Sequence, residues 1–310
     1  MIALYWVWRF GMFLAAVTPR RLSFFIAGFI GGLGYYALPL RRQIARENFA
    51  HVLAKSPSDP EVKRMAHESF RNFGRYLRDV MLYPSLSLPE LQKRVTLKSP
   101  EHFADGLAAG KGLILVSAHF GNMDLAGTII AHRFTPVTLV GETLRPRQLM
   151  DFLTRVRAAR GVILFPYDSA PRKIVQALKR NETTAFLLDF GITHHFDLTT
   201  VPVTFFGMQT NFPAGPAQLA LLTGAPIVVG HAHVATNEHI DVHTNPPLFF
   251  SRNGDRHENL QAIMQQIATL MEEFIRLYPE QWYMFRPMWH HENSVRRIQR
   301  LTKHGSQGAE

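Results

Sequence analysis

The stretch Leu113-Ile-Leu-Val-Ser-Ala-His119-Phe-Gly-Asn-Met-Asp124-Leu-Ala126 decides the fold of this chain. It begins with a short apolar run, typical of a buried strand, which stops at His119. The chain then turns and enters a helix that we predict over 123–133. Asn122 is a favoured helix cap, and the helix dipole stabilises a carboxylate such as Asp124 in the first turn. A strand, a tight turn and a helix in this order indicate an α/β protein.

Apolar runs and amphipathic segments alternate along the chain on both sides of this stretch. Ser58-Asp59-Pro60-Glu61 is a helix-start signature, and Pro84 ends that helix. Further on we predict strands at 112–118, 136–140, 162–166, 184–188, 226–234 and 240–250, and helices at 148–159, 172–179, 216–222 and 260–275. The predicted fold class is α/β, with a mostly parallel or mixed central sheet flanked by helices and an apolar helical segment at the amino terminus.

The composition narrows the classes of protein and partner. Lys and Arg number 34 and Asp and Glu 24, so the net charge is +10; hydrophobic residues make up 46 % of the 310 residues and charged residues only 19 %. So apolar a chain can bury a core, which excludes disorder. A basic, charge-poor chain suits an anionic and apolar partner such as a membrane surface, with nucleic acid as the rival. The absence of cysteine excludes disulfides and a thiol nucleophile.

Residues 1–47 form the predicted membrane-associated segment. Residues 22–40 run without a charge and are followed by Arg41 and Arg42. The run is close to the ~20 residues that span a bilayer, but it contains several glycines. The alternative is a helical hairpin buried against the rest of the protein. We further predict an α/β domain at 48–293 and a basic tail at 294–310, with the arginines holding the domain at the cytoplasmic face of the membrane.

His119 and Asp124 are the candidate catalytic pair. If the carboxylate folds back onto the imidazole, Asp124 orients the ring and His119 accepts a proton as general base. Gly121 would leave room for a substrate in the turn. The alternative is a structural histidine that ends the strand. The chain has no G-x-S-x-G, no P-loop and no G-x-G-x-x-G, so the nucleophile belongs to a substrate hydroxyl or to water.

The motif His119-Phe-Gly-Asn-Met-Asp124 resembles the His-x4-Asp/Glu motif of glycerolipid and lipid A acyltransferases. Three further stretches resemble the branch of late lipid A acyltransferases and phosphatidylinositol mannoside acyltransferases: Thr143-Leu-Arg145-Pro146, Arg157-x3-Gly161-Val-Ile163, and Phe205-Phe206-Gly207 followed by Pro213-Ala-Gly215-Pro216-Ala217. Asp189 ends a predicted strand where that branch tends to carry an acid. The carboxy-terminal segment keeps Trp282 and Arg286 but lacks the basic run of the lipid A enzymes, and so is nearer to the mannoside-acylating group.

The resemblance implies an O-acyltransferase that moves a fatty acyl chain from acyl carrier protein or coenzyme A to a hydroxyl of a membrane glycolipid or phospholipid. It implies no resident cofactor, because the acyl thioester is a co-substrate. Arg145 is the first candidate to stabilise the oxyanion and Arg157 the second. The candidate substrate-binding residues are Gly121, Asn122, Arg157, Asp189, Phe206, Gly207 and Gly215. The implied location is the cytoplasmic face of the inner membrane.

Other classes of function stay open at this point. A hydrolase would use the same histidine to activate water. A nucleic-acid-binding protein would gather its Lys and Arg with stacking aromatic residues on one face, whereas the aromatic residues here concentrate in the apolar amino terminus. His231 and His233 alternate on a predicted strand, but no third ligand accompanies them, and we predict no metal site.

Overall fold

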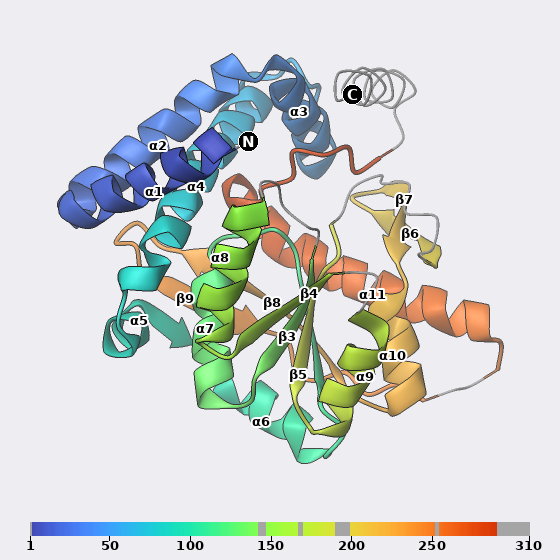
Figure 1. Ribbon diagram of the computed structural model, residues 1–310. Helices are drawn as coiled ribbons and strands as arrows, with labels where there is room; N and C mark the ends of the chain where they lie inside the picture. Colours follow the sequence, from blue (N-terminus) through green and yellow to red (C-terminus); the bar gives the residue numbers. More distant parts are fainter. Residues whose placement is uncertain (1, 142–146, 167–169, 190–198, 252–253, 290–310) are drawn as a thin grey trace, which may run out of the picture.

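A seven-stranded sheet lies at the centre of the computed structural model, which describes residues 2–141, 147–166, 170–189, 199–251 and 254–289. The strand order is β1-β9-β8-β2-β5-β3-β4 (Figure 1), and all neighbours are parallel except the pair β8 and β9. The strands are β1 (Val95–Leu97), β2 (Leu113–Ser117), β3 (Val137–Gly141), β4 (Val162–Pro166), β5 (Thr183–Leu187), β8 (Ile227–Val234) and β9 (Ile240–Thr244). The predicted α/β class with a mostly parallel sheet is confirmed.

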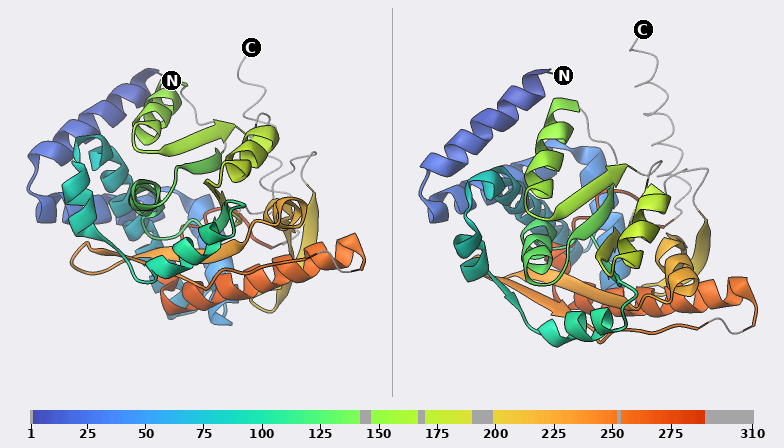
Figure 2. Two further views of the ribbon diagram at one scale, coloured as in Figure 1. Left: turned by 90° about the horizontal axis from the view of Figure 1, so that it is seen from below. Right: turned by 60° about the horizontal axis from the view of Figure 1, so that its bottom comes forward.

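Helices cover both faces of this sheet because alternate residues of β2 point to opposite sides. Leu113 packs in one apolar cluster with residues of α7, whereas Ile114 and Val116 pack in another with residues of α11. Figure 2 shows α7 and α11 on opposite sides of the sheet. The helices are α1 (Ile2–Val17), α2 (Arg20–Ala37), α3 (Pro39–Leu53), α4 (Pro60–Leu82), α5 (Leu88–Arg94), α6 (Pro100–Ala108), α7 (Met123–Arg133), α8 (Arg147–Ala158), α9 (Ala170–Lys179), α10 (Gly215–Thr223) and α11 (Arg256–Leu277).

Most elements lie where the sequence pattern predicts them. The helix-start signature is confirmed, since Asp59 accepts a hydrogen bond from the backbone N–H of Glu61 at 2.7 Å and α4 ends at Leu82. The predicted strand 240–250 stops at Thr244. The short strand β1 and the antiparallel hairpin of β6 (Thr200–Phe205) and β7 (Met208–Pro213) were not predicted.

The amino-terminal helices α1 and α2 both pack against α4 and present an exposed apolar face. Residues of α2 such as Gly28 and Gly32 are buried, and α2 packs along α4. Tyr35 and Phe49 belong to the same apolar cluster as the central strands. Large apolar side chains on the outer face are more than half exposed: Trp6, Val7, Phe10, Phe13, Val17, Phe25, Phe29, Ile30 and Tyr36. The domain division at 47 and 293 stays a prediction, and residues 290–310 lie outside the described ranges.

Within the described residues, no single helix is both long and apolar enough to cross a membrane. The helices α2 and α3 meet the length and hydropathy criteria only as a pair, and they are bent by 97° relative to each other.

Stacked histidines lie on the neighbouring strands β8 and β9. The ring of His231 lies 5.2 Å from that of His243 and 4.7 Å from that of Phe274, measured between centroids. Its buried Nε2 has no hydrogen-bond partner among the described residues, so the ring packs among aromatic neighbours with that nitrogen unpaired. His233 lies on the same strand against Tyr278. No group of three possible metal ligands occurs in the described part of the chain.

We predict that this stack makes the fold sensitive to acid. Burial first, and then the neighbouring His243, lower the pKa of His231 from 6.5 to about 3. The unfolded chain therefore binds a proton more readily than the folded protein as the pH falls below 6.5, and stability is lost progressively toward pH 3. This group alone should lower the free energy of unfolding by about 2 kcal/mol between pH 7 and pH 5. Urea unfolding across this range should show a shallower pH dependence for His231→Phe than for the wild type. An unchanged dependence would contradict this account, and His257→Gln on the exposed first turn of α11 is the control.

Candidate active site

His119 and Asp189 follow neighbouring strands of the central sheet. The strands β2 and β5 pair in parallel with Ser117 opposite Leu187, and each strand is followed two residues later by one of these two side chains. Because parallel strands present their carboxyl ends at the same edge, this pairing brings together two residues that lie 70 positions apart in the chain. That edge is where α/β proteins generally bind their ligands.

The carboxylate of Asp189 is fully buried and holds the ring of His119. Nδ1 of His119 lies 2.9 Å from Oδ1 of Asp189, and the backbone N–H of His119 donates to both carboxylate oxygens at 2.9 Å. The indole N–H of Trp282 donates to Oδ2 at 2.8 Å. A carboxylate at Nδ1 fixes that nitrogen as the proton donor, so Nε2 carries the lone pair of the neutral ring. Held in this way, the neutral ring can accept a proton at Nε2.

These contacts correct the predicted pairing of His119 with Asp124. Asp124 does lie in the first turn of α7, as predicted. Its carboxylate, however, accepts hydrogen bonds from Arg157 at 2.6 and 3.1 Å and from the hydroxyl of Tyr76 at 2.6 Å. The reason is topological. The pairing of β2 with β5 places Asp189 at Nδ1 of the ring, whereas the first turn of α7 directs Asp124 toward side chains of α4 and α8.

Asp124, Arg157 and Tyr76 form a buried ionic cluster beside the histidine. Burial by itself raises the pKa of Asp124, but the charge and hydrogen bonds of Arg157 and the bond from Tyr76 outweigh it and hold the pKa below its ordinary value. Burial lowers the pKa of Arg157 and Asp124 raises it, with a net rise. Burial, and then the carboxylate of Asp124, raise the pKa of Tyr76 well above its ordinary value. At neutral pH the cluster therefore holds a carboxylate, a guanidinium and a neutral phenol.

The turn between β2 and α7 is fixed from both sides. Gly121 has a φ of +55°, and a Cβ there would lie 1.7 Å from the carbonyl oxygen of Ala232. The predicted room for a substrate at Gly121 is therefore filled by protein. Asn122 caps α7 as predicted, since its side chain accepts from the backbone N–H of Leu125 at 3.2 Å. Its amide also donates to Asp79 at 2.8 Å. The buried side chain of Asn122 therefore holds the turn against α4.

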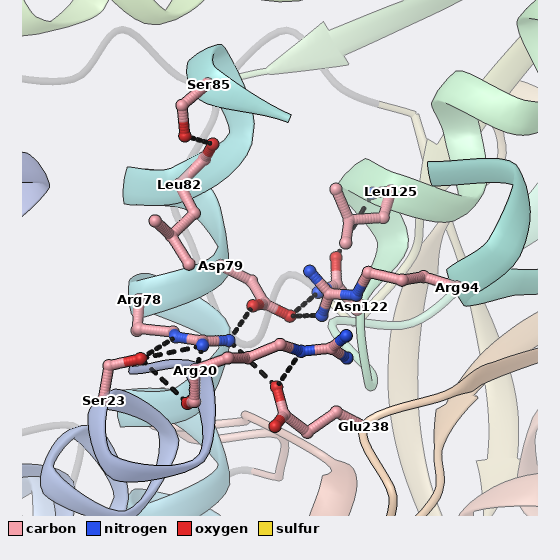
Figure 3. A network of polar contacts seen from close by, with 10 residues as sticks. All are labelled: Arg20, Ser23, Arg78, Asp79, Leu82, Ser85, Arg94, Asn122, Leu125 and Glu238. Atoms are coloured by element: carbon pink, nitrogen blue, oxygen red, sulfur yellow. Dashed lines mark hydrogen bonds and ion pairs between the residues drawn. The ribbon is translucent and has the colours of Figure 1, made fainter. Parts of the chain in front are cut away.

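Asp79 connects this turn with α2 through a buried ionic network (Figure 3). Its carboxylate accepts from Arg78 at 2.7 Å and from Arg94 at 2.9 Å. Arg78 also donates to the hydroxyl of Ser23 in α2 at 2.8 Å and to Glu238 at 3.0 Å. The side chains of Arg78 and Asp79 are each only 4 % exposed, so their charges are stabilised by one another rather than by water.

An apolar cavity of about 890 Å³ lies against this charged cluster. Its wall includes His119, Asp189, Asp124 and Arg157. From there it extends between the sheet and α7, where its lining is apolar: Leu115, Ala126, Gly127, Ile130, Val137, Leu139, Val162, Leu164 and Ala185. Toward the surface it reaches α2 and α4. A cavity of this volume can enclose a long apolar ligand with one end at the histidine.

The other predicted site residues lie apart from this cavity. Phe206 (φ +50°) and Gly207 (φ +76°) form the two-residue turn of the β6–β7 hairpin, because that turn type needs positive φ at both positions. The ring of Phe206 packs near Trp282. Gly215 begins α10 and lines a second cavity of about 670 Å³. Arg145, the predicted oxyanion group, lies outside the described residues.

Three residues of the site were not predicted as such from the sequence. Tyr76 and Asp79 lie three positions apart on α4 and contact the charged groups described above. The sequence feature that could have indicated them is their position, as polar residues, on the inner face of an amphipathic helix. The sequence indicates Trp282 only through the family resemblance. Its hydrogen bond to Asp189 is seen only in the tertiary structure.

Comparison with known protein families identifies the family of this chain. The model of the family described as bacterial lipid A biosynthesis acyltransferase matches residues 1–291. The chain belongs to this family. It is therefore an acyltransferase, and both the family and the enzyme class predicted from the sequence are confirmed.

Two curated proteins that are similar to this chain in sequence are named phosphatidylinositol mannoside acyltransferases. The protein from Mycolicibacterium smegmatis is 30 % identical over 261 residues, which cover 83 % of this chain and 82 % of the relative. The protein from Mycobacterium tuberculosis strain H37Rv is 29 % identical over 265 residues, which cover 83 % of this chain and 80 % of the relative. The similarity thus extends over most of each protein.

Proposed function

We propose that this acyltransferase moves a fatty acyl chain from a thioester of acyl carrier protein or coenzyme A to a hydroxyl of a membrane glycolipid, with His119 as general base. The observation that carries the proposal is the His119–Asp189 pair on the wall of an apolar cavity. A base without a protein nucleophile suits a reaction in which the substrate supplies the attacking hydroxyl.

The proposed chemistry needs one base and one acyl donor. Nε2 of His119 accepts the hydroxyl proton while the hydroxyl oxygen attacks the thioester carbonyl carbon. The tetrahedral intermediate collapses as the C–S bond breaks, and the imidazolium returns the proton to the leaving thiolate. Asp189 stabilises the imidazolium, because its buried carboxylate lies 2.9 Å from Nδ1.

The donor's acyl chain would occupy the part of the cavity between the sheet and α7. Apolar side chains line that part, and the charged groups lie at its other end near His119. Burying each methylene of a chain contributes about 0.8 kcal/mol, so such a cavity favours a long chain. The pantetheine arm of the donor would then lie outside, toward the surface.

Positive charge near the thioester would stabilise the developing oxyanion. Arg157 is the candidate within the described residues, since it lines the cavity and is held by Asp124 in a fixed orientation. Arg145 keeps its proposed role from the family resemblance. In this reading Asp124 acts on Arg157 and not on the histidine.

The exposed apolar face of α1 and α2 would place the enzyme on the membrane. Apolar side chains such as Phe10 and Phe25 are more than half exposed there, and an apolar helical face of this kind inserts at the headgroup level. The basic residues of the chain would hold it on an anionic leaflet, which we propose to be the cytoplasmic face of the inner membrane. The proposed acceptor is a phosphatidylinositol mannoside or a lipid A precursor.

The test is a product analysis with the purified full-length protein. Radiolabelled acyl-coenzyme A or acyl carrier protein thioester is incubated with phosphatidylinositol mannoside or a lipid A precursor in nonionic detergent micelles. We expect label in the acceptor lipid and free thiol in equal amounts. Free fatty acid formed at the same rate without acceptor would instead indicate a hydrolase. A salt-dependent DNA mobility shift without vesicle binding would favour the nucleic-acid alternative.

A further inference from the structure

Two arginines lie together where the catalytic cavity reaches the surface. Arg41 and Arg286 both line the cavity that contains His119. Arg41 lies in the first turn of α3, and its Nη1 donates to the backbone carbonyl of Phe285 at 2.8 Å. The next residue along the chain is Arg286, so this bond keeps the two arginine side chains on the same part of the wall.

The backbone around Arg286 is held rigidly against α3. The side-chain amide of Asn48 donates to the carbonyls of Met284 at 2.9 Å and of Arg286 at 2.8 Å, and its oxygen accepts from the backbone N–H of Met288 at 3.2 Å. Asn48 is buried. Helix α3 therefore carries Arg41 and also holds the backbone of Arg286 in place.

The positive charge at this point is concentrated. Within the described part of the chain Arg41 forms no ion pair, and the first turn of α3 holds no acidic residue. The N-cap position of α3 is Leu38, which offers no capping side chain to the helix N-terminus. Partial desolvation, and then the charge of Arg286, lower the pKa of Arg41, as expected for two cations brought near one another. Two guanidinium groups on the same part of the wall suit an anionic ligand.

The surroundings indicate what kind of anion reaches this place. Ile30 and Leu38 line the same cavity, yet they are 61 % and 51 % exposed. The cavity therefore opens through the exposed apolar face of α2. A ligand that enters there passes from an apolar surface to a pair of guanidinium groups and then to a general base. A lipid with an anionic headgroup and a hydroxyl beyond the charge has this order of groups.

We propose that Arg41 and Arg286 bind the phosphodiester of the acceptor lipid and so hold its sugar hydroxyl toward His119. This inference rests on the proposed acyl transfer. Guanidinium groups suit it, because they form charge-assisted, bidentate hydrogen bonds with phosphate oxygens. The enzyme would accordingly prefer an acceptor with a phosphate between its tails and its sugar.

The test compares an acceptor that carries the phosphodiester with an uncharged acceptor that lacks both the phosphate and the inositol. Phosphatidylinositol mannoside and a mannosyl diacylglycerol with the same tails are offered in nonionic micelles to the wild type, Arg41→Gln and Arg286→Gln. We expect each variant to raise KM for the phosphate-bearing acceptor by ~10–100-fold, with kcat nearly unchanged and KM for the uncharged acceptor unaffected. Arg64→Gln removes the same charge from the exposed surface of α4 and should leave both KM values unchanged.

A second arm separates the acceptor's phosphate from those of the donor. Each protein is assayed with acyl-coenzyme A and with an acyl thioester of N-acetylcysteamine, which has no phosphate. A rise in KM for acyl-coenzyme A alone would overturn the inference, because the arginines would then bind the donor. Unchanged KM values for the phosphate-bearing acceptor in both variants would also overturn it. If the wild type acylates neither acceptor, the proposed function itself fails.

Discussion

Asp189→Asn should lower kcat for acyl transfer by ~10²–10⁴-fold, nearly as far as His119→Ala. The asparagine keeps the shape of the side chain but removes the negative charge that stabilises the imidazolium, and it lets the ring adopt the wrong tautomer. Asp189 also accepts hydrogen bonds from the backbone of His119 and from Trp282, so the amide meets donors on both sides. Initial rates with labelled thioester at saturating acceptor measure the effect.

Two comparisons make this result specific. Asp105→Asn on the exposed surface of α6 should keep full activity, and circular dichroism should show that all variants are folded. Full activity of Asp189→Asn together with an inactive His119→Ala would mean that another group orients the base. That outcome would return Asp124 to the role first predicted for it from the sequence.

Asp79→Ala should destabilise the protein by about 3–5 kcal/mol, because it leaves buried cations without their counter-charge. The carboxylate accepts hydrogen bonds from Arg78, Arg94 and Asn122, and the two arginine side chains are 4 % and 7 % exposed. The loss of the bond to Asn122 also frees the turn that carries His119. We therefore expect activity to fall at temperatures where the variant is still folded.

Chemical denaturation of the wild type and the variant measures the change in unfolding free energy. Glu61→Gln on the same helix is the matched control, since its side chain is 41 % exposed and pairs with Lys55 at the surface. Such exposed pairs contribute at most about 1 kcal/mol. Equal denaturation midpoints for Asp79→Ala and Glu61→Gln would show that the buried network does not stabilise the fold.

The sequence predicted the local parts of this site well. The apolar run before His119 folds as β2, Asn122 caps α7, and Asp124 lies in the first helical turn. All three features depend on neighbours in the chain, namely strand periodicity, cap chemistry and the helix dipole. The same kind of signal identified the start of α4 at Asp59.

Contacts between segments that lie far apart in the chain were harder to predict from the sequence. Phe206 and Gly207 were candidate substrate-binding residues from the family resemblance, and the structure places them in the turn of the β6–β7 hairpin, where φ is positive at both positions. Gly121 similarly suggested room for a substrate, whereas the carbonyl of Ala232 fills the space. In both cases the glycine correctly indicated a turn of the backbone, but it did not indicate which atoms lie opposite that turn.

By itself, the sequence determined the α/β class, the family, the histidine at the end of β2 and the apolar, basic character of the amino terminus. These properties follow from periodicity, composition and motif order along the chain. The partner of the histidine was decided only by the tertiary structure. The strand order places β5 beside β2, so Asp189 reaches Nδ1 of the ring while Asp124 turns to Arg157. Spacing along the chain cannot show this, because strand order is fixed by how the helices on both faces pack the whole sheet.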